Sequence, residues 1–343
     1  MLPSLLVLAM SAAAAASGGG SILVANSGRI DYDGTMDWAS LGSGTVATCR
    51  EDPASDAEFT RRVEECPAVE VVVTKEVPVR ASVIESFPDS VKLLCEAGTG
   101  YNNVDLEACR RKGITVMNVP AYSSDAVATL VMTFILNFSS SLHLQMRRLS
   151  RGDRVNFSSC LQAPHFELRG KTLGLVGGSG GIGSRVRAMA RAFGMKVLIS
   201  TRTPREAEEG GEVQFTDSVP DLLRTSDFVS LHCPLNEATR HLIDAAALRT
   251  MKPSAFLVNT ARGDICDEAA LVDALSEGVI AGAGLDVQST EPPREDSPLY
   301  ALDNVILTPH IGWKRKETRE ALVATVAANI ASFYAAAPQN VVS

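Results

Sequence analysis

The feature that most constrains the fold of this 343-residue chain is a glycine-rich turn between a short apolar run and a helical segment. The turn spans residues 178–183 and has the spacing G-x-G-x-x-G. The apolar run 172–176 precedes it, and apolar residues between 186 and 193 recur at the spacing of one helix face. Such a turn lets a pyrophosphate approach backbone N–H groups at a helix N-terminus. The sequence therefore predicts a dinucleotide site at Gly178, Gly180, Gly181 and Gly183.

The second half of the chain continues as short apolar runs separated by helical stretches. This alternation is typical of a parallel sheet that helices cover on both faces. One predicted helix spans 267–277, with an aspartate as its cap and Gly278 as its stop signal. The pattern indicates a doubly wound nucleotide-binding domain, with strands expected at 172–176, 196–199, 228–231, 255–258, 281–285 and 305–307.

The first part of the chain shows the same alternation. Apolar runs at 22–25, 71–73, 91–95 and 114–117 read as strands, and the stretches 57–65 and 104–112 read as helices. A chain of this length suits about two domains. We therefore predict the α/β fold class, with two doubly wound parallel-sheet domains.

A long apolar segment follows a break at Pro120. From Ser124 to about Arg148 the residues are largely apolar, and Asp125 is placed to cap a helix. We predict one long helix here, suited to a bridge between domains or to a dimer contact, with ordinary core packing as the alternative. A further helix is expected over residues 314–333.

Charge and cysteine content exclude several kinds of protein. The formal charge is −8 at pH 7, whereas nucleic acids and anionic membranes favour an excess of Lys and Arg. The seven cysteines are scattered and form no C-x-x-C pair, which predicts neither a disulfide framework nor a zinc site. We expect no nucleic-acid partner, no membrane partner and no metal.

Residues 1–20 form an N-terminal extension with a short apolar run, an alanine tract and three consecutive glycines. A signal peptide has a similar composition, but no Lys or Arg precedes this apolar run. We expect a disordered or a targeting segment. The expected location is cytoplasmic, unless the segment directs the chain to an organelle or the secretory route.

The end of the second strand of the nucleotide domain bears on which dinucleotide binds. NAD-binding domains place Asp or Glu there for the ribose 2′-hydroxyl. In this chain Thr201 stands at that position and Arg202 follows it. An arginine without a carboxylate suits a 2′-phosphate, so the sequence favours NADP over NAD and places both residues at the cofactor.

Three polar segments follow strands of the second region, where folds of this kind build their sites. They are Asn259–Gly263, Asp286–Pro292 and Thr308–Trp313. Together with Gly98–Asp105 and Leu231–Thr239, they resemble in order and spacing the motifs of the D-isomer-specific 2-hydroxyacid dehydrogenases.

The resemblance runs from about Ile22 to the C-terminal helix. Within the family, Tyr122–Asp125 and His310–Trp313 are most similar to segments of hydroxypyruvate and glyoxylate reductases. The expected architecture is a discontinuous, flavodoxin-like substrate domain with a Rossmann NAD(P)-binding domain inserted in it and the substrate in the cleft. The expected domains are 21–122 with 313–343, and 123–312.

The resemblance also assigns three catalytic roles. Arg262 matches the arginine that holds the substrate carboxylate and keto oxygen, a task for which a planar guanidinium offers two parallel hydrogen bonds. His310 matches the acid/base that gives a proton to the keto oxygen and takes it back in oxidation. Glu291 matches its carboxylate partner, whose charge would keep the histidine protonated near neutrality.

Other contacts are implied by the same resemblance. Main-chain groups and one loop lysine would meet the substrate, namely Gly98, Thr99, Gly100 and Lys75. The cofactor would touch Ile182, Pro234, Thr239, Thr260, Ala261, Asp286 and Gly312, with Asp286 facing the nicotinamide amide. His232, Cys233 and Cys266 are read as structural.

The expected activity is NAD(P)H-dependent interconversion of a small 2-keto acid, such as glyoxylate or hydroxypyruvate, and its D-2-hydroxy acid. Phosphoglycerate, lactate and formate dehydrogenases of the same superfamily are alternatives. A nicotinamide-sensing binding protein, like the family's corepressors, is another, because those retain the same three residues. A homodimer is expected from the resemblance and from the apolar helix.

Overall fold

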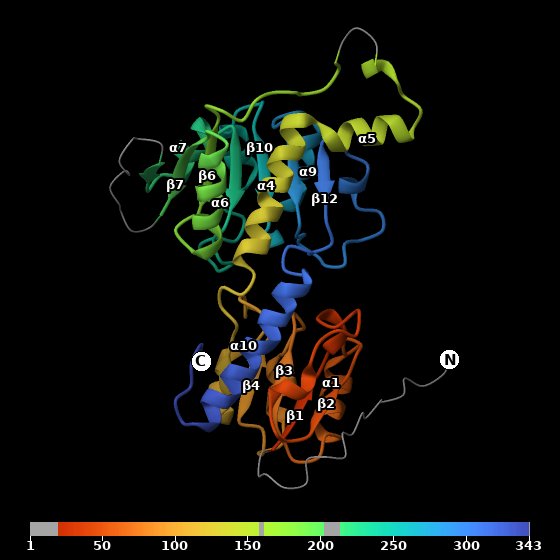
Figure 1. The fold of residues 1–343 in the computed structure, drawn as a ribbon, viewed down its shortest axis with the longest axis vertical. Helices are drawn as coiled ribbons and strands as arrows, with labels where there is room; N and C mark the ends of the chain where they lie inside the picture. The colour runs from red at the N-terminus through yellow and green to blue at the C-terminus, as the bar shows by residue number, and fades with distance from the viewer. Residues whose placement is uncertain (1–19, 158–160, 202–212, 343) are drawn as a thin grey trace. The chain divides into compact units, whose positions relative to one another are not determined.

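The computed structural model describes residues 20–157, 161–201 and 213–342. These residues form two compact units (Figure 1). The first unit combines the chain up to Tyr122 with the chain from Lys314 onward, and the second runs from Ser123 to Trp313. Arg202 and residues 1–19, for which the sequence also gave predictions, lie outside the described residues.

The first unit is built on a five-stranded parallel sheet with strand order β2-β1-β3-β4-β5. Its strands are β1 (Ser21–Val24), β2 (Val46–Thr48), β3 (Val69–Thr74), β4 (Leu93–Glu96) and β5 (Thr115–Met117). The inner strands are buried on both faces, as expected for an apolar parallel sheet with helices on either side.

Helices cover both faces of this sheet. On one face lie α1 (Asp56–Glu64), α2 (Ala81–Ser86) and α3 (Leu106–Lys112), whose apolar residues pack with alternate residues of the strands. The opposite face is covered by α10 (Lys316–Tyr334) and the 3-10 helix η2 (Trp38–Leu41) (Figure 1). The first face is thus built from the beginning of the chain and the second depends on its end.

The second unit contains a seven-stranded parallel sheet with strand order β12-β11-β10-β9-β6-β7-β8. Chain order reverses between β6 and β9, which is where doubly wound sheets bind ligands. The strands are β6 (Thr172–Val176), β7 (Lys196–Ser200), β8 (Val213–Thr216), β9 (Phe228–Leu231), β10 (Phe256–Asn259), β11 (Gly282–Leu285) and β12 (Val305–Leu307).

Two apolar cores, one on each face, stabilise this second sheet. The helices α4 (Ser124–Ser140) and α6 (Gly181–Ala192) pack on one face, with stacked phenylalanines such as Phe138 and Phe256 between helix and strand. The helices α7 (Val219–Thr225), α8 (Ala245–Thr250) and α9 (Glu268–Ser276) pack on the other. The predicted α/β class with two parallel sheets is confirmed.

The prediction of one long helix over 124–148 is wrong. It breaks at Ser141, whose φ is +49°, into α4 and α5 (Leu142–Ser150), which meet at a bend of 65°. Asp125 is not its cap either, because the cap residue is Ser123 and the Asp125 carboxylate pairs with Arg185. Periodicity cannot show such a break, because apolar spacing continues through it.

The apolar residues of α4 are mostly buried within the second unit. Among the described residues no single helix is long and apolar enough to cross a membrane. The bent pair α4–α5 meets the criteria of length and composition only when its two helices are taken together.

Two edge strands were not predicted. β2 has only three residues, all half-buried, and β8 directly follows the undescribed residues 202–212. Both lie at sheet edges, where one-sided pairing leaves a weak apolar pattern.

Candidate active site

Three adjacent strands of the second sheet deliver the predicted catalytic residues to one edge. Arg262 follows β10, Glu291 follows β11 and His310 follows β12. Because β10, β11 and β12 are parallel neighbours, their carboxyl ends meet at the same edge of the sheet. The order of the strands therefore gathers three loops that are far apart in the sequence.

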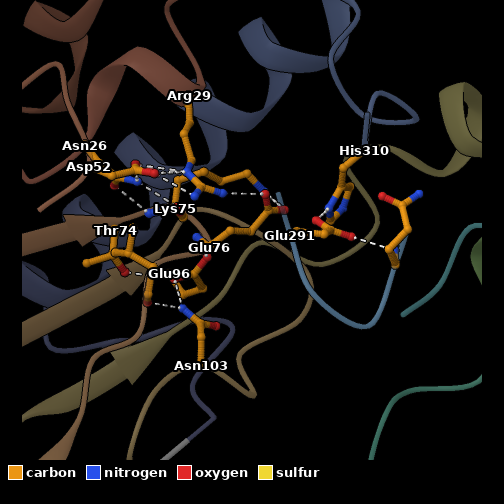
Figure 2. A network of polar contacts seen from close by, with 12 residues as sticks. Asn26, Arg29, Asp52, Thr74, Lys75, Glu76, Glu96, Asn103, Glu291 and His310 are labelled. Carbon is orange, nitrogen blue, oxygen red and sulfur yellow. Dashed lines mark hydrogen bonds and ion pairs between the residues drawn. The ribbon is translucent and has the colours of Figure 1, made fainter. Parts of the chain in front are cut away.

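His310 and Glu291 form a hydrogen-bonded pair. The Nδ1 atom of His310 lies 2.8 Å from Oε2 of Glu291, and Figure 2 shows the imidazole and the carboxylate facing each other. The other oxygen of Glu291 accepts the N–H of Gln288 at 3.1 Å. The carboxylate is therefore fixed from its own loop and orients the ring, which leaves Nε2 as the nitrogen that Glu291 does not hold.

His310 sits on a strained piece of backbone. Its φ is +52°, in the left-handed region that residues other than glycine seldom adopt. Asp286 maintains this conformation: its main-chain oxygen accepts the N–H of His310 at 2.9 Å. Residues held in such conformations cluster at functional sites, where the surrounding structure imposes them.

The carboxylate of Asp286 is almost fully buried and is engaged by the His310 loop. It accepts the Thr308 hydroxyl at 2.6 Å and the N–H groups of Ile311 and Gly312 at 2.8 Å each. Burial raises the pKa of Asp286, while these hydrogen bonds work in the opposite direction. The structure thus shows Asp286 ordering the loop that carries His310.

The Arg262 loop is organised by Asn259, the last residue of β10. Its side-chain oxygen accepts the N–H of Ala261, and its amide donates to the carbonyl oxygen of Arg262 at 2.8 Å. The next residue is Gly263, where a Cβ would lie 2.0 Å from the main chain of Gln288. Glycine here lets the Arg262 loop contact the Glu291 loop directly.

The glycine turn after β6 has the geometry of a dinucleotide loop. A Cβ at Gly183 would lie 2.3 Å from the carbonyl oxygen of Gly178, so this glycine allows helix α6 to pack against the turn. A Cβ at Gly177, whose φ is +77°, would likewise lie 2.8 Å from the main-chain nitrogen of Cys233. These positions need glycine for internal packing.

Gly180 is different, because a Cβ there would meet no non-neighbouring atom of the described residues within 4 Å. It is the N-terminal cap of α6 and forms no side-chain capping bond. The first N–H groups of a helix lack intrahelical partners and attract anions. The open space beside Gly180 and the start of α6 fit a pyrophosphate.

The other predicted cofactor residues fall into two sets. The Thr260 hydroxyl is buried and has no hydrogen-bond partner among the described residues, so it is available to a bound molecule. In contrast, Ala261 and Gly312 use their N–H groups internally, and the Thr239 hydroxyl donates to the carbonyl oxygen of Pro234 at 2.6 Å. Thr201 directly follows β7.

In the first unit, the segment Gly98–Gly100 follows β4 at the carboxyl edge of the five-stranded sheet. The N–H of Gly98 bonds to the carbonyl oxygen of Glu96 at 2.8 Å. Within the described ranges, the N–H groups of Thr99 and Gly100 make no hydrogen bond. Two of the three predicted donors are thus open to a carboxylate, and the Gly98 N–H is not.

Lys75 belongs to a partly buried polar network that we call the first-unit cluster (Figure 2). Its ammonium is buried and lies 2.7 Å from Oε1 of Glu76, a residue with φ +55°. Burial opposes the charge, but Glu76 raises the pKa of Lys75 above its ordinary value. The cluster comprises Asn26, Arg29, Asp52, Thr74, Lys75, Glu76, Glu96 and Asn103.

Glu96 is the buried carboxylate of this cluster. It accepts the Thr74 hydroxyl at 2.8 Å, the Asn103 amide at 2.9 Å and the N–H of Glu76 at 3.0 Å. Burial raises the pKa of Glu96, and the neighbouring Lys75 ammonium opposes this shift. The sequence analysis missed Glu96; the available signal was a charged residue at the carboxyl end of an apolar strand.

Three residues read as structural lie near the candidate site, with Cys266 buried and His232 and Cys233 half-buried. His232 has its Nε2 atom buried without a hydrogen-bond partner in the described part of the chain, and this burial lowers its pKa to about 4. Cys233 and Cys266 pack with the apolar core, and burial raises the pKa of both thiols, that of Cys266 to about 12. Thiols of this kind are poor nucleophiles.

The chain was compared with known proteins. Residues 132–312 match the family model described as D-isomer specific 2-hydroxyacid dehydrogenase, NAD binding domain. D-3-phosphoglycerate dehydrogenase of Methanocaldococcus jannaschii is 41% identical over 263 residues, covering 76% of this chain and 48% of that protein. Glyoxylate reductase of Thermococcus litoralis is 38% identical over 277 residues, covering 79% of this chain and 82% of that protein.

Among solved structures, one similar structure is NADPH-dependent glyoxylate/hydroxypyruvate reductase from Sinorhizobium meliloti in complex with NADP and malonate. It has a TM-score of 0.78 and 27% identity, and the match covers 94% of this chain and 97% of that one. The chain therefore belongs to the D-isomer specific 2-hydroxyacid dehydrogenase family. It is an oxidoreductase of that family, and its second unit is the nicotinamide-dinucleotide-binding domain.

Proposed function

We propose that this protein reduces glyoxylate, hydroxypyruvate or a similarly small 2-keto acid to the D-2-hydroxy acid with NADPH or NADH. The observation that carries the proposal is the His310–Glu291 pair, 2.8 Å apart, at the same sheet edge as Arg262. This combination offers an acid/base, a carboxylate that orients it and a cation for an anionic substrate. Relatives named glyoxylate reductase support the choice of substrate.

Arg262 is proposed to bind the substrate. Its planar guanidinium can donate two parallel hydrogen bonds, one to the carboxylate and one to the keto oxygen. The second bond polarises the carbonyl and stabilises negative charge that develops on its oxygen. Asn259 and Gly263 support this role because they fix the loop that carries Arg262.

His310 is proposed to give a proton from Nε2 to the substrate oxygen during reduction and to take it back during oxidation. Glu291 holds Nδ1, so it sets the ring orientation and stabilises the protonated imidazole. When bound, the nicotinamide supplies or accepts the hydride at the substrate carbon. Asp286 is proposed to keep the His310 loop in its strained conformation and to face the nicotinamide amide.

The turn 178–183 and the start of α6 are proposed to hold the pyrophosphate, with Thr260 as a hydroxyl donor nearby. The further contacts proposed for the cofactor are Ile182, Pro234, Thr239, Ala261 and Gly312. A preference for NADPH is proposed because Thr201 replaces the usual acid after β7. Comparing the KM values of NADPH and NADH tests it, and a clear preference for NADH would contradict it.

On the first unit, the N–H groups of Thr99 and Gly100 are proposed to bind the substrate carboxylate. The domain boundaries proposed from the sequence are 21–122 with 313–343, and 123–312. One unit would hold the substrate and the other the cofactor.

A homodimer is also proposed, although the apolar helix that suggested it in the sequence is mostly buried. The apolar residues of α4 that suggested a dimer contact are buried in the second unit. A group of exposed apolar side chains lies instead on α5 and the 3-10 helix after it: Leu142, Met146, Leu149 and Phe157. Sedimentation of the protein and of Met146→Glu tests this, and a monomeric wild type would refute it.

The function itself is tested by following NADPH and NADH oxidation with glyoxylate, hydroxypyruvate, pyruvate and phenylpyruvate. We expect turnover with glyoxylate and hydroxypyruvate. Arg262→Lys should lower kcat/KM by about 10²-fold, because lysine cannot form the two parallel hydrogen bonds. Cofactor binding without turnover of any acid would favour the nicotinamide-sensing protein instead.

A further inference from the structure

We propose that the carboxyl edge of the five-stranded sheet forms the subsite for the substrate's tail, and that its charge selects a monocarboxylate with an uncharged tail. Keto acids whose tail carries a phosphate or a second carboxylate would be rejected there. The inference rests on the proposed function, because it takes Thr99 and Gly100 as the groups that hold the substrate's own carboxylate.

The location follows from the parallel sheet of the first unit. Arg29 lies in the segment after β1, Lys75 and Glu76 directly follow β3, and Thr99 follows β4. The carboxyl ends of these neighbouring strands share one edge. A Cβ at Gly98 would lie 3.1 Å from Nζ of Lys75, so the proposed carboxylate loop rests directly against the cluster.

The cations of the first-unit cluster are already paired with carboxylates. Arg29 forms an ion pair of 2.6 Å with Asp52, and Lys75 one of 2.7 Å with Glu76 (Figure 2). Glu96 adds a third acid, but its burial raises its pKa and disfavours its charge, so the two ion pairs set the charge of the cluster. Arg62, which donates to the main chain of Asp52, has its own partner in Glu58 and leaves this balance unchanged.

A phosphate or carboxylate on the tail would have to compete with Asp52 or Glu76 for a cation. It would also lie beside these two carboxylates, and like charges brought together in this way disfavour the wrong ligand. A hydroxyl group meets no such cost, because it can donate to a carboxylate oxygen. Charge alone therefore favours hydroxypyruvate over its phosphorylated form.

The cluster is held too firmly to rearrange around an anion. The side chain of Asn26 accepts the N–H of Lys75 at 2.9 Å, donates to its carbonyl oxygen at 2.7 Å and also donates to Asp52. Glu96 fixes Glu76 in its left-handed conformation through the Glu76 N–H. These bonds fix the main chain of Lys75 and Glu76 and the Asp52 carboxylate, so a cation that moved toward a ligand would leave its own carboxylate partner behind.

The first test compares three substrates with NADPH: glyoxylate, hydroxypyruvate and 3-phosphohydroxypyruvate. Glyoxylate has no tail and reports on the proposed function alone. We expect kcat/KM for hydroxypyruvate to exceed that for 3-phosphohydroxypyruvate by about 10²-fold, a discrimination of about 2.7 kcal/mol. Equal or faster turnover of the phosphorylated acid overturns the inference while leaving the proposed function intact.

Glu76→Gln then changes the charge at nearly constant size. It removes one negative charge beside the tail, so the preference for hydroxypyruvate should fall about tenfold. Glu107→Gln is the matched control, because Glu107 lies on α3 with a side chain 70% exposed and outside the cluster. A preference that stays constant in Glu76→Gln, or falls equally in the control, contradicts the subsite.

A binding measurement keeps the inference testable without turnover. Calorimetric titration of the NADP-loaded protein with D-glycerate and with 3-phospho-D-glycerate compares the same two tails. We expect D-glycerate to bind at least about tenfold more tightly. Equal affinity, tighter binding of the phosphorylated acid or no binding of either would refute the subsite.

Discussion

The ionisable side chains at the carboxyl edges of the two parallel sheets differ in their exposure to solvent. In the second unit, the side chains of His310 and Glu291 remain 18% and 34% exposed. In the first unit, Lys75 and Glu96 are 1% and 0% exposed and their polar atoms are held by neighbours. A group that exchanges a proton with substrate must be reachable, whereas a group that shapes a loop must not move.

The comparison teaches that charge alone does not mark a catalytic residue. Substitutions of His310 and Glu291 at the second edge should lower activity with little effect on folding, and those of the fully buried Lys75 and Glu96 at the first should mainly lower stability. Four changes test this division, in order of expected effect.

The largest effect is expected for His310→Gln. Glutamine cannot transfer the proton, so kcat should fall by about 10³-fold, as is typical when a general acid is removed. The thermal midpoint should stay within about 2 °C, because a partly exposed surface side chain contributes little to stability. Steady-state kinetics and thermal melting measure both, with exposed His165→Gln as the control. Activity close to wild type would remove His310 from its proposed role.

Glu96→Ala should do the reverse. It leaves the buried Thr74 hydroxyl, Glu76 N–H and Asn103 amide without their acceptor, so we expect a loss of about 3 kcal/mol in unfolding free energy. Urea unfolding measures the loss, and Glu107→Ala on the surface of α3 is the control. Unchanged stability would show that the first edge is not a rigid support.

Acid should destabilise the second unit through His232. Its pKa in the fold is about 4, below the ordinary value of 6.5, so the unfolded chain binds its proton first as the pH falls. Stability contributed by the neutral ring is therefore complete above about pH 6.5 and is lost toward pH 4; the loss between pH 7 and 5 is about 2 kcal/mol. Urea unfolding at both values should show a smaller difference for His232→Gln. An equal difference in that variant would disprove the assignment.

The smallest effects are expected at two glycines of one turn, which should differ in what they affect. Gly180→Ala meets no protein atom, so the fold should be unaffected while the dissociation constant for NADP rises about tenfold. Gly183→Ala places a methyl group against the Gly178 carbonyl and should lower the melting temperature. Fluorescence titration and thermal melting distinguish the two variants. A lower melting temperature for Gly180→Ala would contradict the open space beside Gly180.

Much of the framework could be predicted from the sequence because short apolar strands and helix signals are local. The runs at 172–176, 228–231 and 305–307 coincide with β6, β9 and β12. The edge strands β2 and β8 and the break at Ser141 were missed, since these two strands have a weak apolar pattern and the break is set by backbone conformation. Local pattern carries no information about either.

The site divides in the same way. The loop positions of Arg262, Glu291 and His310 followed from their place after strands that turn out to be neighbours. The supports did not: Asn26 bonds to Lys75 across 49 residues, and Thr74 to Glu96 across 22. Which buried polar groups meet is decided by strand register, and no single segment of sequence contains that information.

The division of the first unit between both ends of the chain has a consequence for synthesis. Its sheet is complete by residue 117, but α10, which covers one face, begins only at Lys316. While the ribosome makes the second unit, that apolar face is covered only in part, by the short helix η2, and domains generally fold in the order of their synthesis. The inserted unit can therefore fold before the unit that surrounds it in sequence is complete. The nascent chain must meanwhile shield an unfinished sheet, a task suited to a ribosome-associated chaperone.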